Sequence, residues 1–334
     1  MMYFLLGLSI ALAALLTFNS IASLFASLLW RVLGKGTPRF SAASSASIIF
    51  LLRIFPIVIG TVCVAMLLAP AYLAHEPRTS HEDISLKLAT VAAASAVGLA
   101  LALFRGFAAW RATSRLTSAW MREADSFELP QIGIPAFRIE HSFPVIAIVG
   151  MLRPRLFIAN KVLSSLTPSE LLAAIEHEAG HVVAYDNLKR GLMRACRDVL
   201  VVVPCGRRLD RAWLEASEAA ADEFAAGKGS KTALDLASAL VKIARLVPMG
   251  VKPVMPAGAF LIQTADSGGV KSRVRRLMQL ANNVNHPQAN GIVLKIPMWI
   301  PIALTVIAVA ITATEPHVLA SVHWLMEHAV QFLN

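Results

Sequence analysis

Four long apolar stretches constrain this chain more than any other feature of its sequence. A helix needs about 20 apolar residues to cross a bilayer, and each stretch approaches or exceeds that length. The composition agrees, since 56% of the residues are hydrophobic, against roughly 45–50% in a soluble domain. We therefore predict a mainly α-helical, polytopic membrane protein with about four transmembrane helices. The predicted spans are Tyr3–Trp30, Ile54–Ala74, Leu86–Phe104 and Ile296–Ala313.

Basic residues are distributed unevenly between the loops that follow these spans. The loop after the second span, His75–Ser85, is net acidic, whereas the segments after the first and third spans are basic. Positively charged loops stay on the cytoplasmic side of a membrane. We therefore expect the N-terminus outside and the long segment after the third span in the cytoplasm. The basic residues that set this orientation are Arg31, Lys35 and Arg39 after the first span and Arg105, Arg111 and Arg115 after the third.

The overall charge narrows the class of partner. The chain carries 31 Lys and Arg against 21 Asp and Glu, a formal surplus of +10. Such a surplus suits nucleic acid or an anionic membrane face. The apolar content favours the membrane, so we expect the lipid bilayer as a partner and no direct nucleic-acid binding. The cysteines Cys63, Cys196 and Cys205 have no paired spacing, and we expect them to be reduced.

The layout divides the chain into three regions. Residues 1–109 hold three spans, residues 110–291 form the one large polar block, and residues 292–334 hold the fourth span and a tail. The polar block is long enough for one compact domain, which the expected orientation places in the cytoplasm. The tail, residues 314–334, has apolar residues at helical spacing and predicts an amphipathic helix on the outer surface.

The polar block contains both strand and helix signals. Two segments rich in Val, Ile and Phe, Arg138–Gly150 and Arg155–Asn160, predict short strands separated by a turn. A helix follows, with Thr167 as N-cap, a proline at its first position and Glu170 as capping-box partner. A second helical segment, LDRAWLEASEAAADEFAAG, ends near Gly227. We therefore expect a cytoplasmic α+β domain.

Two histidines and a glutamate lie inside the first of these helices, in the run HEAGH. His177 and His181 are four residues apart and share a helix face, where both imidazoles can reach one metal ion. Glu178 follows the first histidine, where its carboxylate can act as general base on a water molecule at the metal. The pattern predicts a catalytic Zn²⁺ site. A chance HExxH on an ordinary helix is the alternative, and its position within a capped amphipathic helix disfavours it.

A catalytic zinc needs a third protein ligand, and the second helical segment offers one. Glu218 can complete a His–His–Glu set, with Glu215 or Glu223 as the alternatives. Asp222 lies one turn after Glu218 on the same face. It can accept a hydrogen bond from a ligand imidazole and so select its tautomer.

A basic amphipathic helix is predicted over Val270–Leu280, the run VKSRVRRLMQL. One interpretation is a cationic face against anionic lipid headgroups. The other is that Arg273 points toward the active site and supports the charge of a tetrahedral transition state. The sequence leaves these two open.

Several runs of the polar block resemble motifs of a known protein family. The run PVIAIVGMLRPRLFIANKVLSSLTPSELLAAIEHEAGHVVAYDNLKR resembles the core of BlaR/MecR-type membrane zinc metallopeptidases. LEASEAAAD resembles their E-x-x-x-D motif, and SRVRRL resembles a motif of the related HtpX and CAAX prenyl protease group. The resemblance implies a gluzincin-like, zincin-type fold in which His177, His181 and Glu218 bind zinc and Glu178 is the catalytic base. It also implies a bacterial-type inner (plasma) membrane and cleavage of a cytoplasmic or membrane-associated protein, such as a transcriptional repressor.

The sequence departs from this family in two places. BlaR and MecR sensors carry a penicillin-binding domain after the last span, whereas only the tail follows here, so we expect no antibiotic sensing of that kind. The relatives often have a bulkier residue in place of Gly180. HEAGH also occurs in AAA-type membrane proteases, but this chain has no Walker loop.

Several functional interpretations remain besides regulated proteolysis. One is HtpX-like quality control of membrane proteins, and another is a non-catalytic zinc-binding sensor or scaffold, which the presence of Glu178 disfavours. A transporter is disfavoured because the spans contain few polar residues. For the protease, we expect an edge strand near Val145–Val149 to hold an extended substrate by strand addition, which Ala147→Pro would impair. Substrate, trigger and oligomeric state do not follow from the sequence.

Overall fold

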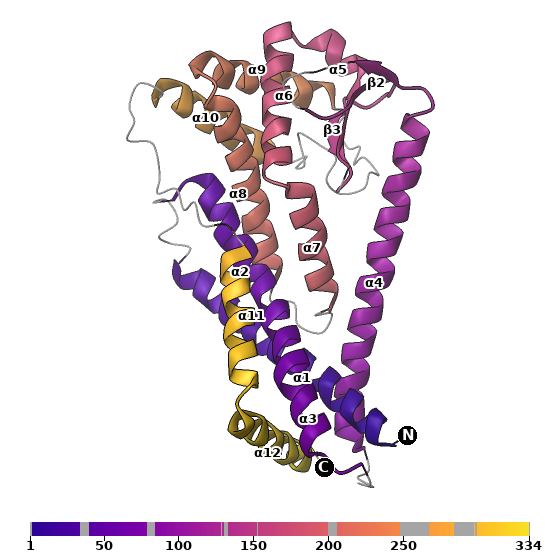
Figure 1. The fold of residues 1–334 in the computed structure, drawn as a ribbon. Helices are drawn as coiled ribbons and strands as arrows, with labels where there is room; N and C mark the ends of the chain where they lie inside the picture. The colour runs from indigo at the N-terminus through magenta and orange to yellow at the C-terminus, as the bar shows by residue number, and fades with distance from the viewer. Residues whose placement is uncertain are drawn as a thin grey trace.

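A computed structural model describes residues 2–33, 40–78, 84–127, 129, 133–151, 153–199, 206–247, 267–283, 297 and 299–333. This part of the chain is mostly helical, with one small sheet (Figure 1). The sheet, α6, α9 and α10 lie at one end of an elongated molecule, and α3 and α12 lie at the other (Figure 1). The helices are α1 Met2–Leu33, α2 Ala42–Cys63, α3 Ala69–His75, α4 Leu86–Trp120, α5 Asn160–Ser165, α6 Pro168–Val183, α7 Asp186–Val199, α8 Arg207–Ala226, α9 Ser230–Leu246, α10 Ser267–Asn283, α11 Trp299–Ala313 and α12 Pro316–Leu333.

Three helical segments of the described chain are long and apolar enough to cross a membrane. They are Met2–Val32, Ala42–His75 and Leu86–Trp120. The second consists of α2, a π-helical turn at Val64–Leu68 and α3. The expected fourth span differs, because α11 has only 15 residues, roughly 22 Å of helix against a bilayer core of about 30 Å. It joins α12 through a bend of 93°, and only the two together make a fourth candidate.

The second span begins earlier than hydropathy predicts. Ser41 accepts a hydrogen bond from the backbone of Ser44 and caps α2, so Arg53 lies within the helix and not before it. Its side chain is buried, and its Nε atom lies 2.9 Å from Oδ1 of Asp210 on α8. Because the charge is paired, an apolar helix can carry it.

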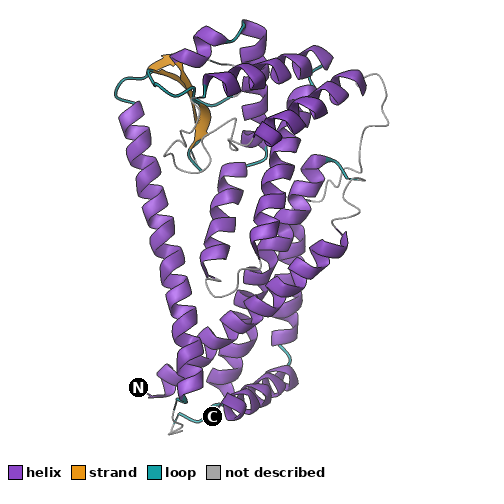
Figure 2. Cartoon of the chain, turned by 180° about the vertical axis from the view of Figure 1, so that it is seen from behind, coloured by secondary structure: helices purple, strands orange, loops and turns teal. Residues whose placement is uncertain are grey.

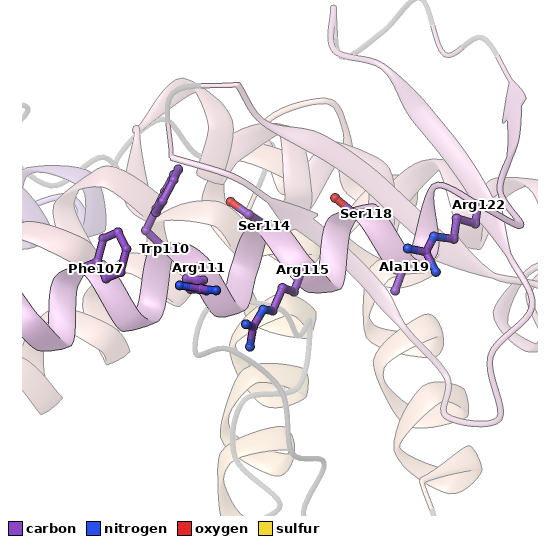
Figure 3. Close-up of a pocket in the computed structure, with 8 residues that line it drawn as sticks. All are labelled: Phe107, Trp110, Arg111, Ser114, Arg115, Ser118, Ala119 and Arg122. Atoms are coloured by element: carbon purple, nitrogen blue, oxygen red, sulfur yellow. The ribbon is translucent and has the colours of Figure 1, made fainter.

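The third span also extends further, since α4 runs unbroken to Trp120. The expected domain boundary at 109/110 therefore falls inside one helix. A shallow hollow follows one face of its second half (Figure 3), where the side chains of Phe107 and Trp110 are exposed beside Arg111 and Arg115. Exposed aromatic and basic side chains past an apolar run are typical of the headgroup region of a membrane.

The sheet has four strands in the order β1-β2-β4-β3. β1 Asp125–Phe127 and β2 Ala136–Ile139 are antiparallel, β2 and β4 Arg155–Ala159 are parallel, and β3 Ile146–Val149 pairs antiparallel with β4. Figure 2 shows the sheet from behind. The predicted strand 138–150 was wrong as one element, because the chain leaves β2 and returns as β3 on the far side of β4. β1 was not predicted.

β3 is an edge strand, as expected, but all four of its residues are buried. The N–H of Ala159 bonds to the carbonyl of Val145. Since an antiparallel strand alternates its bonding direction, the backbone of Ala147 also faces β4, and that of Ile146 and Ile148 faces away. Proline at Ala147 would therefore break the sheet itself, so the expected use of Ala147→Pro as a probe of substrate binding was wrong.

The helix that carries HEAGH begins as its sequence predicts. In α6 the Thr167 hydroxyl accepts from the backbone of Glu170, and the Glu170 carboxylate accepts from the backbone of Thr167. α8 ends at Ala226, with Gly227 as its C-cap. Both helices pack around a core whose buried strand residues, including Phe157 and Ile158, are fully enclosed. This core gives α6 and α8 a rigid support.

The predictions for the C-terminal tail and for the cysteines can be compared with the described residues. The tail is helical over α12, and Met326 and Val330 pack against Tyr3 and Tyr72, so part of its apolar face is covered by the protein, whereas Trp324, Leu325 and Phe332 are exposed. Cys63 and Cys196 are free thiols. Cys205, together with Lys35 and Arg39 of the first basic loop, lies outside the described residues.

Candidate metal centre

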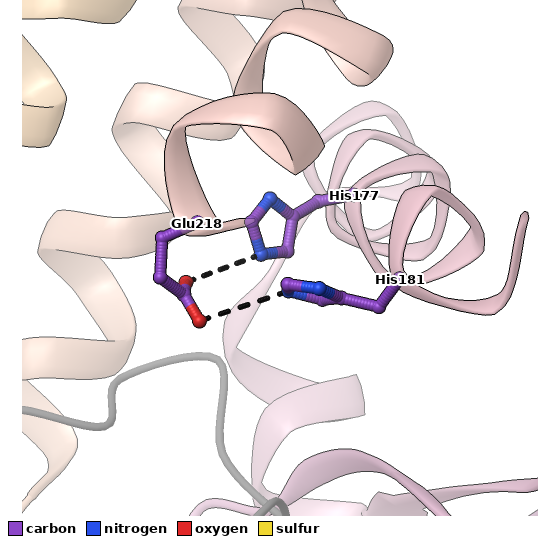
Figure 4. Close-up of side chains that lie close together, drawn as sticks. All are labelled: His177, His181 and Glu218. Carbon is purple, nitrogen blue, oxygen red and sulfur yellow. Dashed lines mark ion pairs between the residues drawn. The ribbon is translucent and has the colours of Figure 1, made fainter. Parts of the chain in front are cut away.

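α6 and α8 bring His177, His181 and Glu218 together (Figure 4). One atom from each lies within 4.8 Å of the other two. The Nε2 atom of His177 is 3.7 Å from one Glu218 oxygen, and Nε2 of His181 is 3.7 Å from the other. These distances exceed those of ordinary hydrogen bonds. They are close to the roughly 3.4 Å that separates two ligand atoms of one tetrahedral zinc ion, each about 2.1 Å from the metal.

The Nδ1 atoms of both imidazoles are held by carboxylates. Nδ1 of His177 lies 3.0 Å from Asp222 Oδ1, and Nδ1 of His181 lies 2.7 Å from Asp186 Oδ2. A carboxylate at Nδ1 favours the tautomer with its proton there, which leaves the Nε2 lone pair for a metal. Both rings are therefore oriented with Nε2 toward Glu218.

The role of Asp186 was not predicted from the sequence. Asp186 is in fact 4% exposed. Tyr185 has a positive φ of 55°, and this left-handed residue separates α6 from α7, which begins at Asp186. The signal available in the sequence was an aspartate five residues after the second histidine.

The surroundings of the Glu218 carboxylate show whether these residues fit a metal ion. Both of its carboxylate oxygens are buried and receive no hydrogen bond within the described chain, although Arg273 Nη1 lies 3.0 Å from Oε2 as an ion pair. Buried acceptors without donors are rare and costly. Two imidazoles and a carboxylate are also a ligand set that suits catalytic zinc. The residues therefore fit a zinc ion.

Glu178 lies on the same helix and is 4% exposed. Burial raises its pKa to about 7, the charge of Glu218 acts in the same direction, and the nearby cationic groups of His181 and Arg273 oppose it. A carboxyl group with a pKa near the working pH can both accept and return a proton. This is the property expected of the catalytic base.

Arg273 lies in the site and not on a lipid-facing surface. Its guanidinium contacts Asp222 at 2.6 and 3.0 Å and Glu218 at 3.0 Å. α10 turns its apolar face to the core, where Leu277 is fully buried. Of the two sequence interpretations, the structure supports the position of Arg273 near the candidate metal ligands, with Asp222 and Glu218 as its partners.

The charges of the site shift the pKa values of its groups. Burial works against the charge of Asp222, but Arg273 and His177 hold its pKa below the usual range. Burial lowers the pKa of His177. For His181, burial acts downward, but the hydrogen bond with Asp186 and the charge of Glu218 raise the pKa to about 9. A metal ion must therefore displace a proton from His181.

Gly180 sets how closely the two ligand helices approach. A Cβ atom at this position would lie 3.1 Å from Cα of Ala221 and 3.2 Å from Cβ of Phe224. Any side chain would press on the backbone of α8 three residues from Glu218. The glycine that departs from the resembled family thus lies where α6 and α8 approach each other closely.

The two alternative ligands on α8 lie outside the group. Glu215 is exposed. Glu223 accepts from the backbone N–H of Ala42 at 3.0 Å and pairs with Arg276, so it joins α8 to the start of α2 and to α10.

Comparisons with protein-family models, with curated proteins and with solved structures found no match to this chain.

Proposed function

We propose that the chain is a membrane-embedded zinc-dependent endopeptidase that cleaves a cytoplasmic or membrane-associated protein. The observation that carries the proposal is the buried carboxyl of Glu178, which lies on the same helix as His177 and His181. The ligand atoms of these histidines and of Glu218 lie within 4.8 Å of one another. A structural zinc site needs no such group. The membrane assignment rests on the three apolar helices, and the cytoplasmic placement on the basic residues that flank them.

The proposed chemistry assigns a task to each residue. His177, His181 and Glu218 would hold the zinc ion, and Asp222 and Asp186 orient the two imidazoles. When bound, zinc supplies Lewis-acid polarisation of the scissile carbonyl and makes an attacking water more acidic. The Glu178 carboxylate takes the proton of that water and returns it to the leaving amine. Arg273 neutralises Asp222 and Glu218 and positions the latter.

The burial of strand β3 favours regulated proteolysis over broad quality control. β3 is one of the two edge strands, yet Ile146 and Ile148 are 1% and 4% exposed, so an extended peptide cannot pair with it until a neighbouring segment moves. An enzyme that is latent until signalled fits this arrangement. An enzyme for broad quality control fits it less well, because its substrate groove would need to be open.

The test compares wild type with Glu178→Gln, both purified in detergent, on an unfolded casein-like substrate. The matched control is Glu176→Gln, two residues earlier on α6, where the glutamate pairs with Lys228 outside the site. If wild type and the control cleave this substrate, we expect Glu178→Gln not to cleave it, and we expect all three to hold the same amount of zinc. Equal cleavage by Glu178→Gln would refute the proposal.

Two further results separate the alternatives. Zinc retained by all variants with no cleavage of casein, but cleavage of a single partner protein in membranes, identifies a narrow regulatory protease. Zinc retained with no cleavage of any membrane or cytoplasmic protein identifies the non-catalytic sensor. No zinc on wild type would refute the ligand assignment.

A further inference from the structure

A second group of metal-ligating side chains lies far from the first. Glu76 follows α3, and His323 and Glu327 lie one turn apart on α12. One ligand atom from each lies within 4.8 Å of the other two. α3 and α12 are in contact, and Figure 1 places them at the end of the molecule opposite the sheet.

We propose that Glu76, His323 and Glu327 bind a divalent transition-metal ion of the zinc class. Nε2 of His323 lies 3.4 Å from Oε1 of Glu327, longer than a usual hydrogen bond. It matches the roughly 3.4 Å between two ligand atoms of a tetrahedral zinc ion. An imidazole nitrogen with two carboxylates suits zinc and its neighbours, whereas calcium and magnesium select oxygen ligands.

A cation suits the ligands of this group. A divalent ion among the ligand atoms of Glu76 and Glu327 would attract both carboxylates. Nδ1 of His323 is buried and has no hydrogen-bond partner within the described chain, although 16% of the side chain is exposed.

The surrounding structure holds these ligands in place without the ion. The backbone N–H of Glu76 bonds to the carbonyl of Tyr72, which fixes the end of α3. The ring of His75 stacks on that of His323 with centroids 5.6 Å apart. Met326 and Val330, on the same helix, are buried against α1 and α3. The ion would therefore connect the tail helix to the end of the Ala42–His75 segment.

This inference is independent of the proposed enzyme activity. Under the proposed orientation the site faces the outside of the membrane, so it would take metal from a different compartment than His177 and His181. Its test therefore counts metal and does not measure proteolysis.

The experiment measures zinc retained per full-length chain in detergent after equilibration with buffered Zn²⁺ and gel filtration. We expect two zinc ions on wild type and one on His323→Ala or Glu327→Gln. Glu327 is 47% exposed, so Glu327→Gln is not expected to unfold α12. The matched control is His328→Ala on the same helix, where the histidine bonds to the Trp324 carbonyl and lies outside the group. It should retain two.

His181→Ala separates this site from the first. We expect His181→Ala to lose one zinc and to keep the second, and the His181→Ala/His323→Ala double variant to hold none. If His323→Ala and Glu327→Gln both retain as much zinc as wild type, the proposal is overturned, whatever the result for His181→Ala. If His181→Ala retains two and His323→Ala one, this site stands and the assignment of His181 is wrong.

Discussion

Nδ1 of His181 lies 2.7 Å from Oδ2 of Asp186, across the turn that joins α6 to α7. The same turn places Asn187 so that its side-chain amide donates to the carbonyls of Ile148 and Gly150, at 3.0 and 3.1 Å. Two adjacent residues at the start of α7 thus contact His181 of α6 on one side and the β3 edge of the sheet on the other.

Asp186→Ala is expected to weaken zinc binding. Without the carboxylate, Nδ1 of His181 has lost its acceptor, and the ring no longer favours the tautomer that offers Nε2. Loss of such a partner typically lowers metal affinity about 10- to 100-fold. The measurement is competition for Zn²⁺ against a chelator of known affinity, with Glu176→Gln as the control. Equal affinity in Asp186→Ala and wild type would contradict the role given to Asp186.

Asn187→Ala is expected to destabilise the protein, because the carbonyls of Ile148 and Gly150 lose a shared donor. An unsatisfied buried carbonyl costs about 1–3 kcal/mol, which thermal unfolding in detergent will detect. Asn187→Asp should be worse, since it places carboxylate oxygens against the carbonyls. A melting temperature of Asn187→Asp equal to or above that of Asn187→Ala would contradict this account.

Gly180→Val is expected to push α6 away from α8 and so to separate His181 from Glu218. Overpacking of this kind costs about 1–3 kcal/mol, and zinc content should fall with stability. Gly106→Ala is the matched control, because a Cβ atom there meets nothing within 4 Å and alanine is the better helix former. If Gly180→Val keeps its zinc and its melting temperature, the close approach of the two helices does not position the ligands.

The hydrogen bonds of Glu170 lead to a prediction of how the stability of the fold depends on pH. Burial acts to raise its pKa, but hydrogen bonds from Lys242, Ser238 and Thr167 outweigh this and lower the pKa to about 2, from an ordinary value of 4.5. Because the folded-state pKa is the lower one, the stabilisation is complete above pH 4.5 and is lost as the pH falls toward 2.

Glu170→Gln should therefore cost about 1–2 kcal/mol at neutral pH, and this difference from wild type should shrink between pH 4.5 and 2. Unfolding at a series of pH values checks it. Ser238→Ala serves as the comparison, since it removes one hydrogen bond at 2.6 Å but keeps the charge of Glu170, so its stability should still fall with acid. A difference between Glu170→Gln and wild type that is constant with pH would be inconsistent with this role of the charge.

The sequence by itself determined the elements that depend on near neighbours. The capping box at Thr167 and Glu170 and the shared face of His177 and His181 arise within a single helix, so local spacing is enough to predict them. The three apolar helices follow from the same kind of information, because the cost of burying a polar backbone in a bilayer depends on the segment alone.

Only the tertiary structure decided which distant groups meet. Asp186 reaches His181 through the left-handed residue Tyr185, and Arg273 reaches Asp222 because α10 packs beside α8. The pairing of Arg53 with Asp210 and the meeting of Glu76 with His323 likewise join residues far apart in the chain. Such contacts depend on the packing of whole helices against a shared core, and local residue spacing carries no information about that packing.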